Sequence, residues 1–329
     1  MNKKNEPYLE TYPQRVLDFM NYSSTIRGKS DSTLEAYSYD LGLFFRFVKK
    51  HRKLVSADVS FDEILIHDID DEFLQKITLS EIYSFLSYTD RQRKNSTYAR
   101  ARKTACIKTF FNYLHIKARI IDKDPTIELE RPKIMKRNPV YLTLPESLHL
   151  LRSMDKENIN YPRDYCILTL FLNCGLRLSE LVSIRISKIK EDTLTVIGKG
   201  NKERVVYLNQ ACVASINDYM QIRSKIDVIE SDKDYLFLST HRKQINKRSV
   251  ENLVKKHTTH AGLIDERYSP HKLRHTAATL MYKHGKVDIR SLQMILGHEN
   301  VSTTQIYTHV DNESLREAVK LNPLSDEMD

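Results

Sequence analysis

The sequence has few cysteines and no long apolar run, and each shortage excludes a class of protein. The cysteines number four and show no C-x-x-C spacing, which argues against a disulfide framework and predicts reduced, mostly buried thiols. No apolar run approaches the ~18 residues of a membrane span. The opening residues, MNKKNEPY, also lack the apolar stretch of a secretory signal. We therefore expect a soluble, cytoplasmic protein with no membrane partner.

Acidic residues are outnumbered by basic ones. The chain has 52 Lys and Arg against 43 Asp and Glu, with a net charge of +9 and a pI of about 9.1. This balance suits a polyanionic partner such as nucleic acid. The 329 residues are enough for roughly two domains, each with its own core.

The first part of the chain has the periodicity of helices. Apolar residues recur at helical spacing between residues 34 and 48, and Ser32 with Glu35 forms a capping box that predicts the start of that helix. Thr78 and Glu81 repeat the box before a short helix through 86. We also expect helices near 16–22 and from about 96 to 115. Residues 51–77, rich in charge, read as a loop with room for one short helix.

A proline-rich stretch separates this part from the rest. Residues 130–145, ERPKIMKRNPVYLTLP, have three prolines and four basic residues without helical periodicity, which predicts an extended linker. The expected organisation is an N-terminal helical domain over 8–130, a linker over 131–143, a second domain over 144–318 and a polar tail over 319–329.

The second domain is predicted to be mostly helical with a small antiparallel sheet, so the fold is mainly α. The stretch LTVIGKGNKERVVYL indicates a β-hairpin that turns at 198–201. Helical patterns fill most of the remainder, at 145–154, 167–171, 212–226, 248–261, 271–284, 288–296 and 312–320.

Several short blocks in this domain carry residues suited to phosphate chemistry. Arg177 lies in CGLRLSEL and Arg274 in SPHKLRHT, and a guanidinium can bind two phosphate oxygens at once. An isolated Arg is more often a surface residue, or here a partner of Glu180. However, His298 follows in an L-G-H block, and Tyr307 comes nine residues after it.

Together these blocks resemble the tyrosine recombinases, the family of integrases and Xer proteins. That family's signature is an Arg in G-L-R-x-S-E-L, a hairpin Lys, H-x-x-R, a G-H pair and a Tyr, and each element is present here in the family's order. The segment KSDSTLEAYSYDL, from Lys29 to Leu41, is similar to the family's N-terminal core-binding helices. The resemblance implies the tyrosine recombinase fold, with a SAM-like core-binding domain and a catalytic domain that form a C-shaped clamp around duplex DNA.

The resemblance also implies roles for individual residues in a reaction that needs no metal and no cofactor. Arg177 and Arg274 would hold the scissile phosphate, Tyr307 would form a 3′-phosphotyrosyl bond, and His271 would accept the tyrosine proton. Lys199 at the hairpin tip would protonate the 5′-oxygen, with Lys202 as a rival acid, and His298 would donate to a phosphate oxygen. The implied catalytic set is Arg177, Lys199, His271, Arg274, His298 and Tyr307.

Each role has a simpler alternative. Among 18 tyrosines, Tyr307 could be a helix residue packed on Ile306 or Val310. Lys199 could be a solvated turn residue, and His298 a structural histidine. The closely spaced histidines could suggest a metal site, but no Cys or acidic residue is spaced to complete it; they are His271, His275, His284, His298 and His309.

Basic residues also crowd one part of the N-terminal domain. A cationic helix of this kind can lie in a DNA groove and neutralise phosphates, although it could equally be a solvated face. With the catalytic domain beside it, DNA binding is the better interpretation. The predicted DNA-binding residues are Arg91, Arg93, Lys94, Arg100, Arg102, Lys103, Lys108 and, in the hairpin, Lys202.

The resemblance further implies how the protein assembles. Residues 311–320 resemble the terminal helix that family members pack onto a neighbouring protomer, so we expect monomers that form a tetramer on two double-stranded DNA sites. The tetramer could be homomeric or shared with a sister recombinase, with a DNA translocase or accessory protein as a further partner.

Other functions with similar chemistry stay open. They are a phage or transposon integrase, a non-catalytic DNA-bridging protein and a type IB topoisomerase. The lack of residues before Tyr8 for an arm-binding domain favours a Xer-like protein, whereas the length of 51–77 argues against that role.

Overall fold

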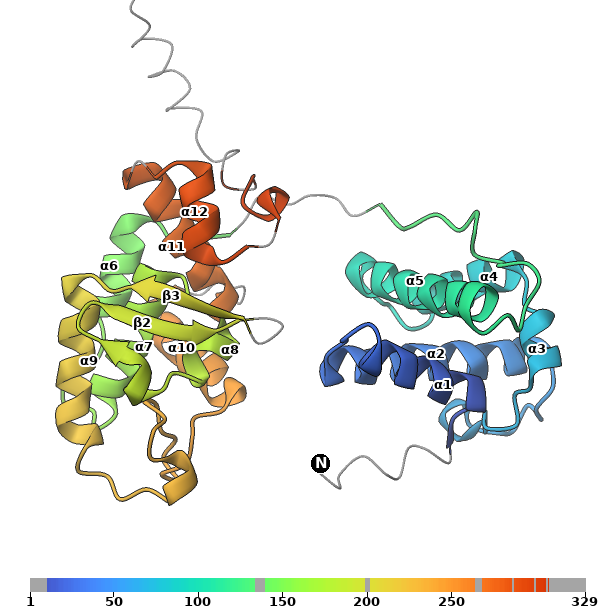
Figure 1. The fold of residues 1–329 in the computed structure, drawn as a ribbon, viewed down its shortest axis with the longest axis horizontal. Helices are drawn as coiled ribbons and strands as arrows, with labels where there is room; N and C mark the ends of the chain where they lie inside the picture. The colour runs from blue at the N-terminus through green and yellow to red at the C-terminus, as the bar shows by residue number, and fades with distance from the viewer. Residues whose placement is uncertain are drawn as a thin grey trace, which may run out of the picture. The chain divides into compact units, whose positions relative to one another are not determined.

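The computed structural model describes residues 11–133, 140–198, 202–263, 268–285, 287–298, 300–305 and 307. The chain divides into two compact units, residues 1–136 and residues 137–329 (Figure 1). Each unit has its own apolar core.

Unit 1 is a helical bundle around α2. Its α-helices are α1 (Gln14–Thr25), α2 (Asp31–His51), α3 (Asp71–Gln75), α4 (Leu79–Arg91) and α5 (Thr97–Asn112), joined by a 3-10 turn η2 (Phe61–Glu63) and followed by a π-helical turn η3 (Tyr113–Lys117). Helix α2 packs against α1, α4 and α5, as Figure 1 shows. Their apolar faces bury six phenylalanines, and edge-to-face ring pairs such as Phe44 with Phe85 hold the core.

The predicted starts of the helices in unit 1 meet different outcomes. The Thr78–Glu81 capping box is confirmed, and Ser96 caps α5 by accepting from Ala99 N–H. The Ser32–Glu35 box is wrong: Ser30 is the residue before the first turn of α2, and its side chain makes no capping bond. Residues 51–77 hold two short helical segments with buried isoleucines, so this stretch is more ordered than the loop we expected.

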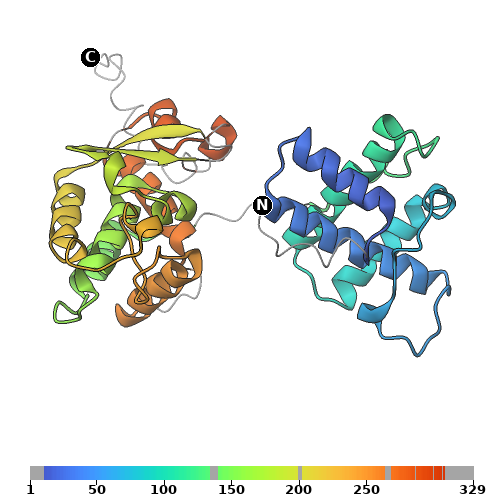
Figure 2. The same ribbon diagram turned by 60° about the horizontal axis from the view of Figure 1, so that its bottom comes forward.

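Unit 2 is built around the buried helix α7 (Tyr161–Cys174), which packs against α6 (Leu144–Arg152), α9 (Gln210–Arg223) and α11 (Pro270–His284). This packing is why α7 reads as an almost unbroken apolar run. Figure 2 shows the helices of unit 2 from a second direction. The remaining elements are α8 (Leu178–Val182), α10 (Lys247–His260), α12 (Ile289–Leu296) and the 3-10 turns η4 (Ile186–Lys188), η6 (Glu230–Asp232) and η7 (Val301–Thr303).

The sheet of unit 2 confirms the predicted hairpin. Strands β1 (Ile189–Lys190), β2 (Thr193–Ile197) and β3 (Glu203–Tyr207) are antiparallel in the order β1-β2-β3. Thr193 pairs with Tyr207 and Ile197 with Glu203, and Gly198 N–H donates to Lys202 O at 2.7 Å. The tip, 199–201, and the expected helix at 312–320 lie outside the described residues. Strand β1 was not predicted.

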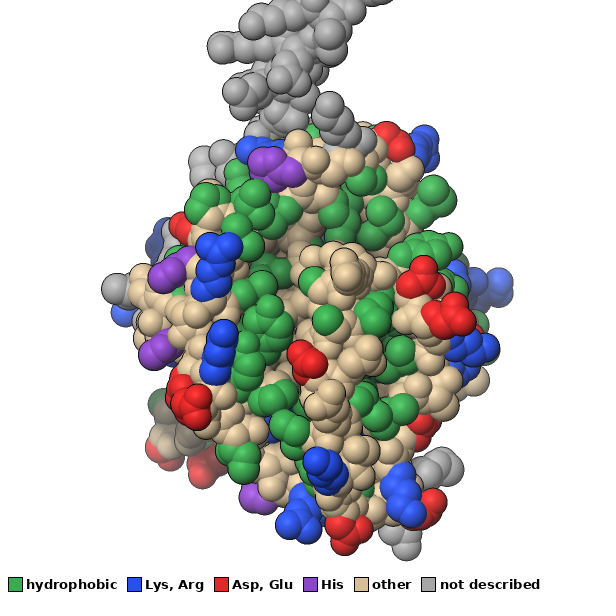
Figure 3. Space-filling view, turned by 90° about the vertical axis from the view of Figure 1, so that its left-hand side faces the viewer, with side chains coloured by type: hydrophobic (Ala, Val, Ile, Leu, Met, Phe, Trp, Pro, Cys, Tyr) green, Lys and Arg blue, Asp and Glu red, His purple; other side chains and the backbone are tan. Residues whose placement is uncertain are grey.

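The four cysteines are buried free thiols, as expected. None of the helices in the described ranges is both long and apolar enough to cross a membrane. Figure 3 shows the face of unit 2 that carries α9: hydrophobic side chains lie across its middle, and basic and acidic side chains are intermixed around them. This face therefore offers no continuous basic surface to a polyanion.

Candidate active site

A left-handed turn after α7 positions the first predicted arginine. Gly175 has φ +59° and ends the helix. A Cβ at this position would lie 2.9 Å from Leu296 Cδ2, which is too close for an unstrained contact, so both the conformation and the space favour glycine. Two residues later, Arg177 precedes the first turn of α8.

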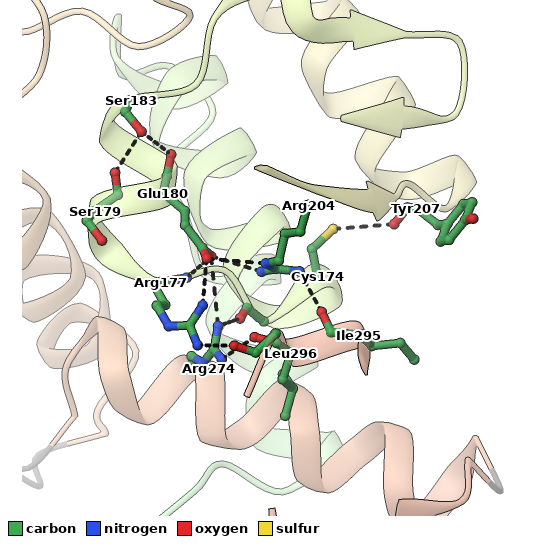
Figure 4. Close-up of polar contacts among 12 residues, drawn as sticks. Cys174, Arg177, Ser179, Glu180, Ser183, Arg204, Tyr207, Arg274, Ile295 and Leu296 are labelled. Carbon is green, nitrogen blue, oxygen red and sulfur yellow. Dashed lines mark hydrogen bonds and ion pairs between the residues drawn. The ribbon is translucent and has the colours of Figure 1, made fainter. Parts of the chain in front are cut away.

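Glu180 of α8 is the centre of the polar cluster in Figure 4. Its side chain has no exposed surface, and its two oxygens accept from the Arg177 backbone N–H at 2.8 Å and from Arg177 Nη1 at 2.8 Å. Arg204 of β3 donates to the same carboxylate from Nη2 at 2.9 Å and Nε at 3.2 Å. Burial alone would raise the pKa of Glu180, but the two arginines hold it below its usual value.

Arg274 of α11 approaches the same carboxylate, with Nη1 3.9 Å from Glu180 Oε2. Its Nη1 donates to Gly175 O and its Nη2 to Leu296 O, both at 2.6 Å. These bonds use two of the five N–H groups of a guanidinium. The side chain is 5% exposed, and burial, followed by the charge of Arg177, lowers its pKa to about 10.

The end of α12 closes the cluster from another side. Gly297, which ends α12, has φ +62°, and its carbonyl accepts from Arg177 Nη2. A Cβ on Gly297 would lie 2.7 Å from Arg204 Cδ, so a larger residue would displace Arg204. At the hairpin, a Cβ on Gly198 would lie 4.0 Å from Arg177 Nη1. The residue before Lys199 is therefore close to Arg177, although Lys199 itself lies outside the described residues.

Tyr307 lies in a small apolar cluster with Ala278, Leu292 and Leu296, and it is 1% exposed. Burial raises its pKa to about 12, against the opposing charge of Arg274. Its hydroxyl is 2.7 Å from His275 Nδ1. The neighbours that would test packing on Ile306 or Val310 lie outside the described residues.

The two histidines of α11 form a chain with this tyrosine. His275 Nε2 is 3.0 Å from His271 Nε2. The predicted proton acceptor, His271, therefore has His275 between it and Tyr307, because residues four apart on a helix share one face and His275 is the nearer. The direct hydrogen-bond partner of the hydroxyl is His275, and the role of His271 as proton acceptor stays a prediction.

His298 lies next to the arginine cluster and contacts the segment that leads to Tyr307. Its Nδ1 is 2.9 Å from Thr304 Oγ1. Burial, and then the charges of Arg274 and Arg177, lower its pKa to about 4. Within the described ranges, no group of three or more His, Cys, Asp and Glu side chains could hold a metal ion.

Two residues of this site were not predicted. Arg204 lies in a strand whose sequence, ERVVY, has no feature beyond alternation. His275 was considered only as a metal ligand, and its spacing of four from His271 was the available signal. By contrast, the contact of Arg177 with Glu180, which we gave as the simpler alternative for that arginine, is present.

The predicted DNA-binding residues of unit 1 differ in how much charge they can offer. Arg91 and Lys94 are exposed. Arg100 pairs with Asp90 at 2.8 Å, Arg93 lies over the Phe61 ring, and Lys108 donates to Leu129 O. These residues span the end of α4, the following turn and α5, rather than one helix start.

Lys103 and Arg102 both bind one buried carboxylate. Lys103 Nζ is 2.6 Å from Asp40 Oδ1, and the Lys103 side chain is 3% exposed. A cation buried in an ion pair cannot reach a phosphate without breaking that pair, so we remove Lys103 from the proposed DNA-binding residues. Arg102 also pairs with Asp40 but remains 43% exposed.

Known proteins resemble this chain over most of its length. A family model described as the phage integrase family matches residues 141–314. The chain is 54% identical to a protein named tyrosine recombinase XerC from Caldanaerobacter subterraneus subsp. tengcongensis, over 99% of this chain and 92% of that one.

Solved structures share the fold. One is the XerH site-specific recombinase bound to a palindromic difH substrate in a post-cleavage complex, with a TM-score of 0.70, 22% identity and coverage of 93% of this chain and 84% of that one. Another is a lambda integrase tetramer bound to a Holliday junction, with a TM-score of 0.63, 17% identity and coverage of 88% and 77%.

Proposed function

The chain belongs to the phage integrase family and is a tyrosine site-specific recombinase, and from this premise we propose that Tyr307 forms the covalent 3′-phosphotyrosyl bond with DNA. The observation that carries this proposal is that Arg177 and Arg274 both lie beside the Glu180 carboxylate. The positive charge of Arg274 also acts on the Tyr307 hydroxyl and opposes the rise in its pKa. Two guanidinium groups so close together suit a ligand with several negatively charged oxygens.

The proposed reaction uses these groups in the place of a metal ion. Arg177 and Arg274 bind the non-bridging oxygens of the scissile phosphate and stabilise the charge that builds on them during attack. His298 donates a further hydrogen bond, and His271 takes part in removal of the tyrosine proton. The phosphotyrosyl bond keeps the free energy of the phosphodiester, so the 5′-hydroxyl of another strand can reseal the backbone without ATP.

The negative charge of Glu180 offsets the repulsion among the three arginines that surround it. Its carboxylate stabilises Arg177 and Arg204 by direct bonds and Arg274 at longer range. Such bonds fix the orientation of the guanidinium groups in advance, which lowers the cost of ordering them when a phosphate binds. Arg204 is therefore proposed as a positioning residue.

Tyr307 is covered in this structure, because its ring is packed in an apolar cluster and its hydroxyl bonds to His275. Attack on DNA requires the scissile phosphate to reach this hydroxyl, so the side chains that cover the ring must move aside. We infer that binding of DNA displaces this cover and leaves the hydrogen bond to His275 in place.

Lys199 is the proposed acid for the 5′-oxygen. The family motif supports this assignment, as does the position of the adjacent Gly198 near Arg177. We expect Lys199→Ala to slow cleavage about 10²-fold. A substrate with a 5′-bridging sulfur should restore the rate, because a thiolate leaves without a proton. If cleavage is instead slowed in Lys202→Ala, and the substrate with the 5′-bridging sulfur restores the rate of that variant, then Lys202 is the acid.

The proposed domains follow from this assignment. Residues 8–130 would bind the core DNA site, 131–143 would link the domains, 144–318 would catalyse and 319–329 would form the tail. In unit 1, phosphate contacts are proposed for Arg91, Arg93, Lys94, Arg100 and Arg102, with Lys202 adding one from the hairpin.

We propose that the protein acts in the cytoplasm as a tetramer on two DNA sites. The tetramer would use the C-terminal helix and contain this protein alone or a sister recombinase as well, with a DNA translocase or accessory protein as a further partner. The fold shared with a tetrameric integrase supports this arrangement. The 54% identity to XerC over nearly the whole chain favours a Xer-like role in resolving chromosomes or plasmids over integration of a mobile element.

A nicked duplex tests the chemistry. The DNA site is first enriched from random-sequence DNA by binding to the Tyr307→Phe protein. The duplex used in the assay carries a nick beside the scissile phosphate. After cleavage, the short fragment between the nick and the cut diffuses away and the adduct accumulates. The native protein should form a covalent adduct, and Tyr307→Phe should form none while binding with the same affinity. Tyr282→Phe, which alters a tyrosine packed on the same cluster, serves as the control. An adduct with Tyr307→Phe would refute the assignment.

A further inference from the structure

The hydroxyl of Tyr307, two imidazoles and solvent form a continuous path in unit 2. Tyr307 Oη lies 2.7 Å from His275 Nδ1, and His275 Nε2 lies 3.0 Å from His271 Nε2. His271 is exposed. Both distances are those of hydrogen bonds, so the path has no gap between the buried hydroxyl and water.

The protonation states fix which group donates and which accepts in each hydrogen bond of this path. Burial raises the pKa of Tyr307 to about 12 and lowers that of His275 to about 3, and burial also lowers the pKa of His271. All three groups are therefore neutral near pH 7, and each neutral imidazole has one N–H. If the phenol donates to His275 Nδ1, then His275 donates from Nε2, and the proton of His271 is on Nδ1.

We propose that His275 is a further catalytic residue, which accepts the proton of Tyr307 and relays a proton through His271 to solvent. The phenolic O–H bond breaks as an N–H bond forms at His275 Nδ1. The proton on His275 Nε2 moves to His271 Nε2, and the proton on His271 Nδ1 passes to water. The electron pair left on the phenolic oxygen attacks phosphorus, and the bond between phosphorus and the 5′-oxygen breaks. Its electron pair stays on the 5′-oxygen, which takes up a proton from the acid proposed above. This proposal rests on the proposed function and deepens it.

The charges around His275 suggest what controls the relay. Burial is the largest influence that lowers its pKa, followed by His271, Lys272, Arg274 and His298, so His275 is a weak base before DNA binds. A phosphodiester at Arg177 and Arg274 adds negative charge beside these groups and raises the pKa of both histidines. Binding of the substrate would thus raise the basicity of His275 at the moment when the phosphate reaches the Tyr307 hydroxyl.

An asparagine at position 275 separates proton transfer from positioning. Its amide oxygen can accept the phenol's hydrogen bond in place of Nδ1, but it cannot take up the proton. We expect His275→Asn to form the adduct about 10²-fold more slowly than the native protein. Its rate should also rise with pH as hydroxide replaces the missing base. The control is His284→Asn, an exposed histidine at the end of the same helix, and it should match the native protein.

Chemical rescue guards against a variant that merely folds poorly. In His275→Ala, added imidazole should restore part of the adduct rate, and substituted imidazoles should restore it in proportion to their basicity. A purely structural histidine would show no such dependence. A rate for His275→Asn within about twofold of the native rate, or a deficit in His275→Ala that imidazole does not change, would overturn the relay.

The outcomes also separate this inference from the proposed function. If the native protein and His284→Asn form no adduct on the enriched site, the function itself is wrong. If both form it and His275→Asn does so equally fast, only the relay fails.

Discussion

Each unit of this protein contains a carboxylate with no exposed surface that holds several cations, and the two clusters differ in what they leave exposed. In unit 1, Asp40 binds Lys103 and Arg102; in unit 2, Glu180 binds Arg177 and Arg204, with Arg274 nearby. Both carboxylates have no exposed surface. Burial dominates at Asp40 and raises its pKa, whereas the arginines prevail at Glu180 and lower its pKa.

The difference lies in the donors that remain after the pair has formed. Lys103 is enclosed with its carboxylate, so that ion pair can only shape the core, whereas Arg102 of the same cluster keeps 43% of its side chain exposed. At Glu180, Arg177 keeps 31% of its side chain exposed, and each guanidinium has more N–H groups than its bonds here use. Burial of an ion pair alone therefore does not decide whether it is structural or functional. What decides is whether its cation keeps exposed N–H groups that can bind a ligand.

The largest expected effect concerns the exposed cations of unit 1, which the Asp40 cluster does not neutralise. If about six to ten phosphates are bound, affinity should fall by roughly three to five decades between 50 and 200 mM salt. Replacing Arg91 and Lys94 with Gln should flatten the log–log slope by about one unit for each phosphate that is no longer neutralised. Titrations by fluorescence anisotropy measure the slope. Arg15→Gln, which alters an arginine paired with Asp71, should leave it unchanged, and a salt-independent affinity would contradict the proposal.

The next effect tests whether Arg274 is needed for its several directed N–H donors or only for its positive charge. Arg274→Lys keeps a cation but cannot reach both carbonyls and a phosphate, so the single-turnover cleavage rate should fall about 10³-fold. Arg223→Lys is a matched control, because Arg223 is also buried and also donates to two carbonyls, Lys233 O and Tyr235 O. Equal losses of cleavage in both variants would mean that Arg274 is needed only for folding.

A double-mutant cycle tests whether the Asp40 cluster is structural. Asp40→Leu alone leaves the buried Lys103 without its partner and should lower the free energy of unfolding by about 3 kcal/mol. Lys103→Met alone should cost less, because Arg102 still pairs with Asp40. The double variant should regain most of that loss and still cleave DNA. Urea unfolding measures the free energies. A stable double variant that does not bind DNA, when Arg102→Gln does bind it, would instead assign Lys103 a direct role.

The smallest effect is a dependence of stability on pH in unit 2. An unfolded histidine has a pKa near 6.5, whereas His275 and His298 have pKa values of about 3 and 4 in the folded protein. Between these values the unfolded chain binds more protons, so acidification below about pH 6.5 should lower the Tm by a few degrees. His275→Asn should make the Tm less sensitive to pH, and His284→Asn should not. Identical profiles for His275→Asn and the native protein would contradict the lowered pKa of His275.

Periodicity was sufficient to predict most elements from the sequence. Amphipathic helices such as α2 and α4, the β2–β3 hairpin and the Thr78–Glu81 capping box depend on contacts between near neighbours, which the sequence displays directly. The cap of α2 was misplaced by two residues because several serines and threonines near position 31 compete for the same role.

The details that failed depend on contacts between distant residues. Arg204 joins Glu180 only because β3 lies beside α8, and nothing in ERVVY indicates this. The burial of Lys103 depends on Asp40, 63 positions earlier in the chain. Which of His271 and His275 contacts the hydroxyl depends on which turn of α11 lies nearest to Tyr307. Motif order identified the chemistry, but it could not decide between neighbouring side chains.

The internal counterion at Glu180 also bears on selectivity among anions. An open cluster of three arginines would attract sulfate, nucleotides and other small anions that are abundant in cells. Because the carboxylate already satisfies part of their charge, a free anion gains little by competing for them. A phosphate delivered as part of a long duplex, held at many other points, does not face the same disadvantage. Glu180 can thus act as a filter that reserves the arginines for DNA.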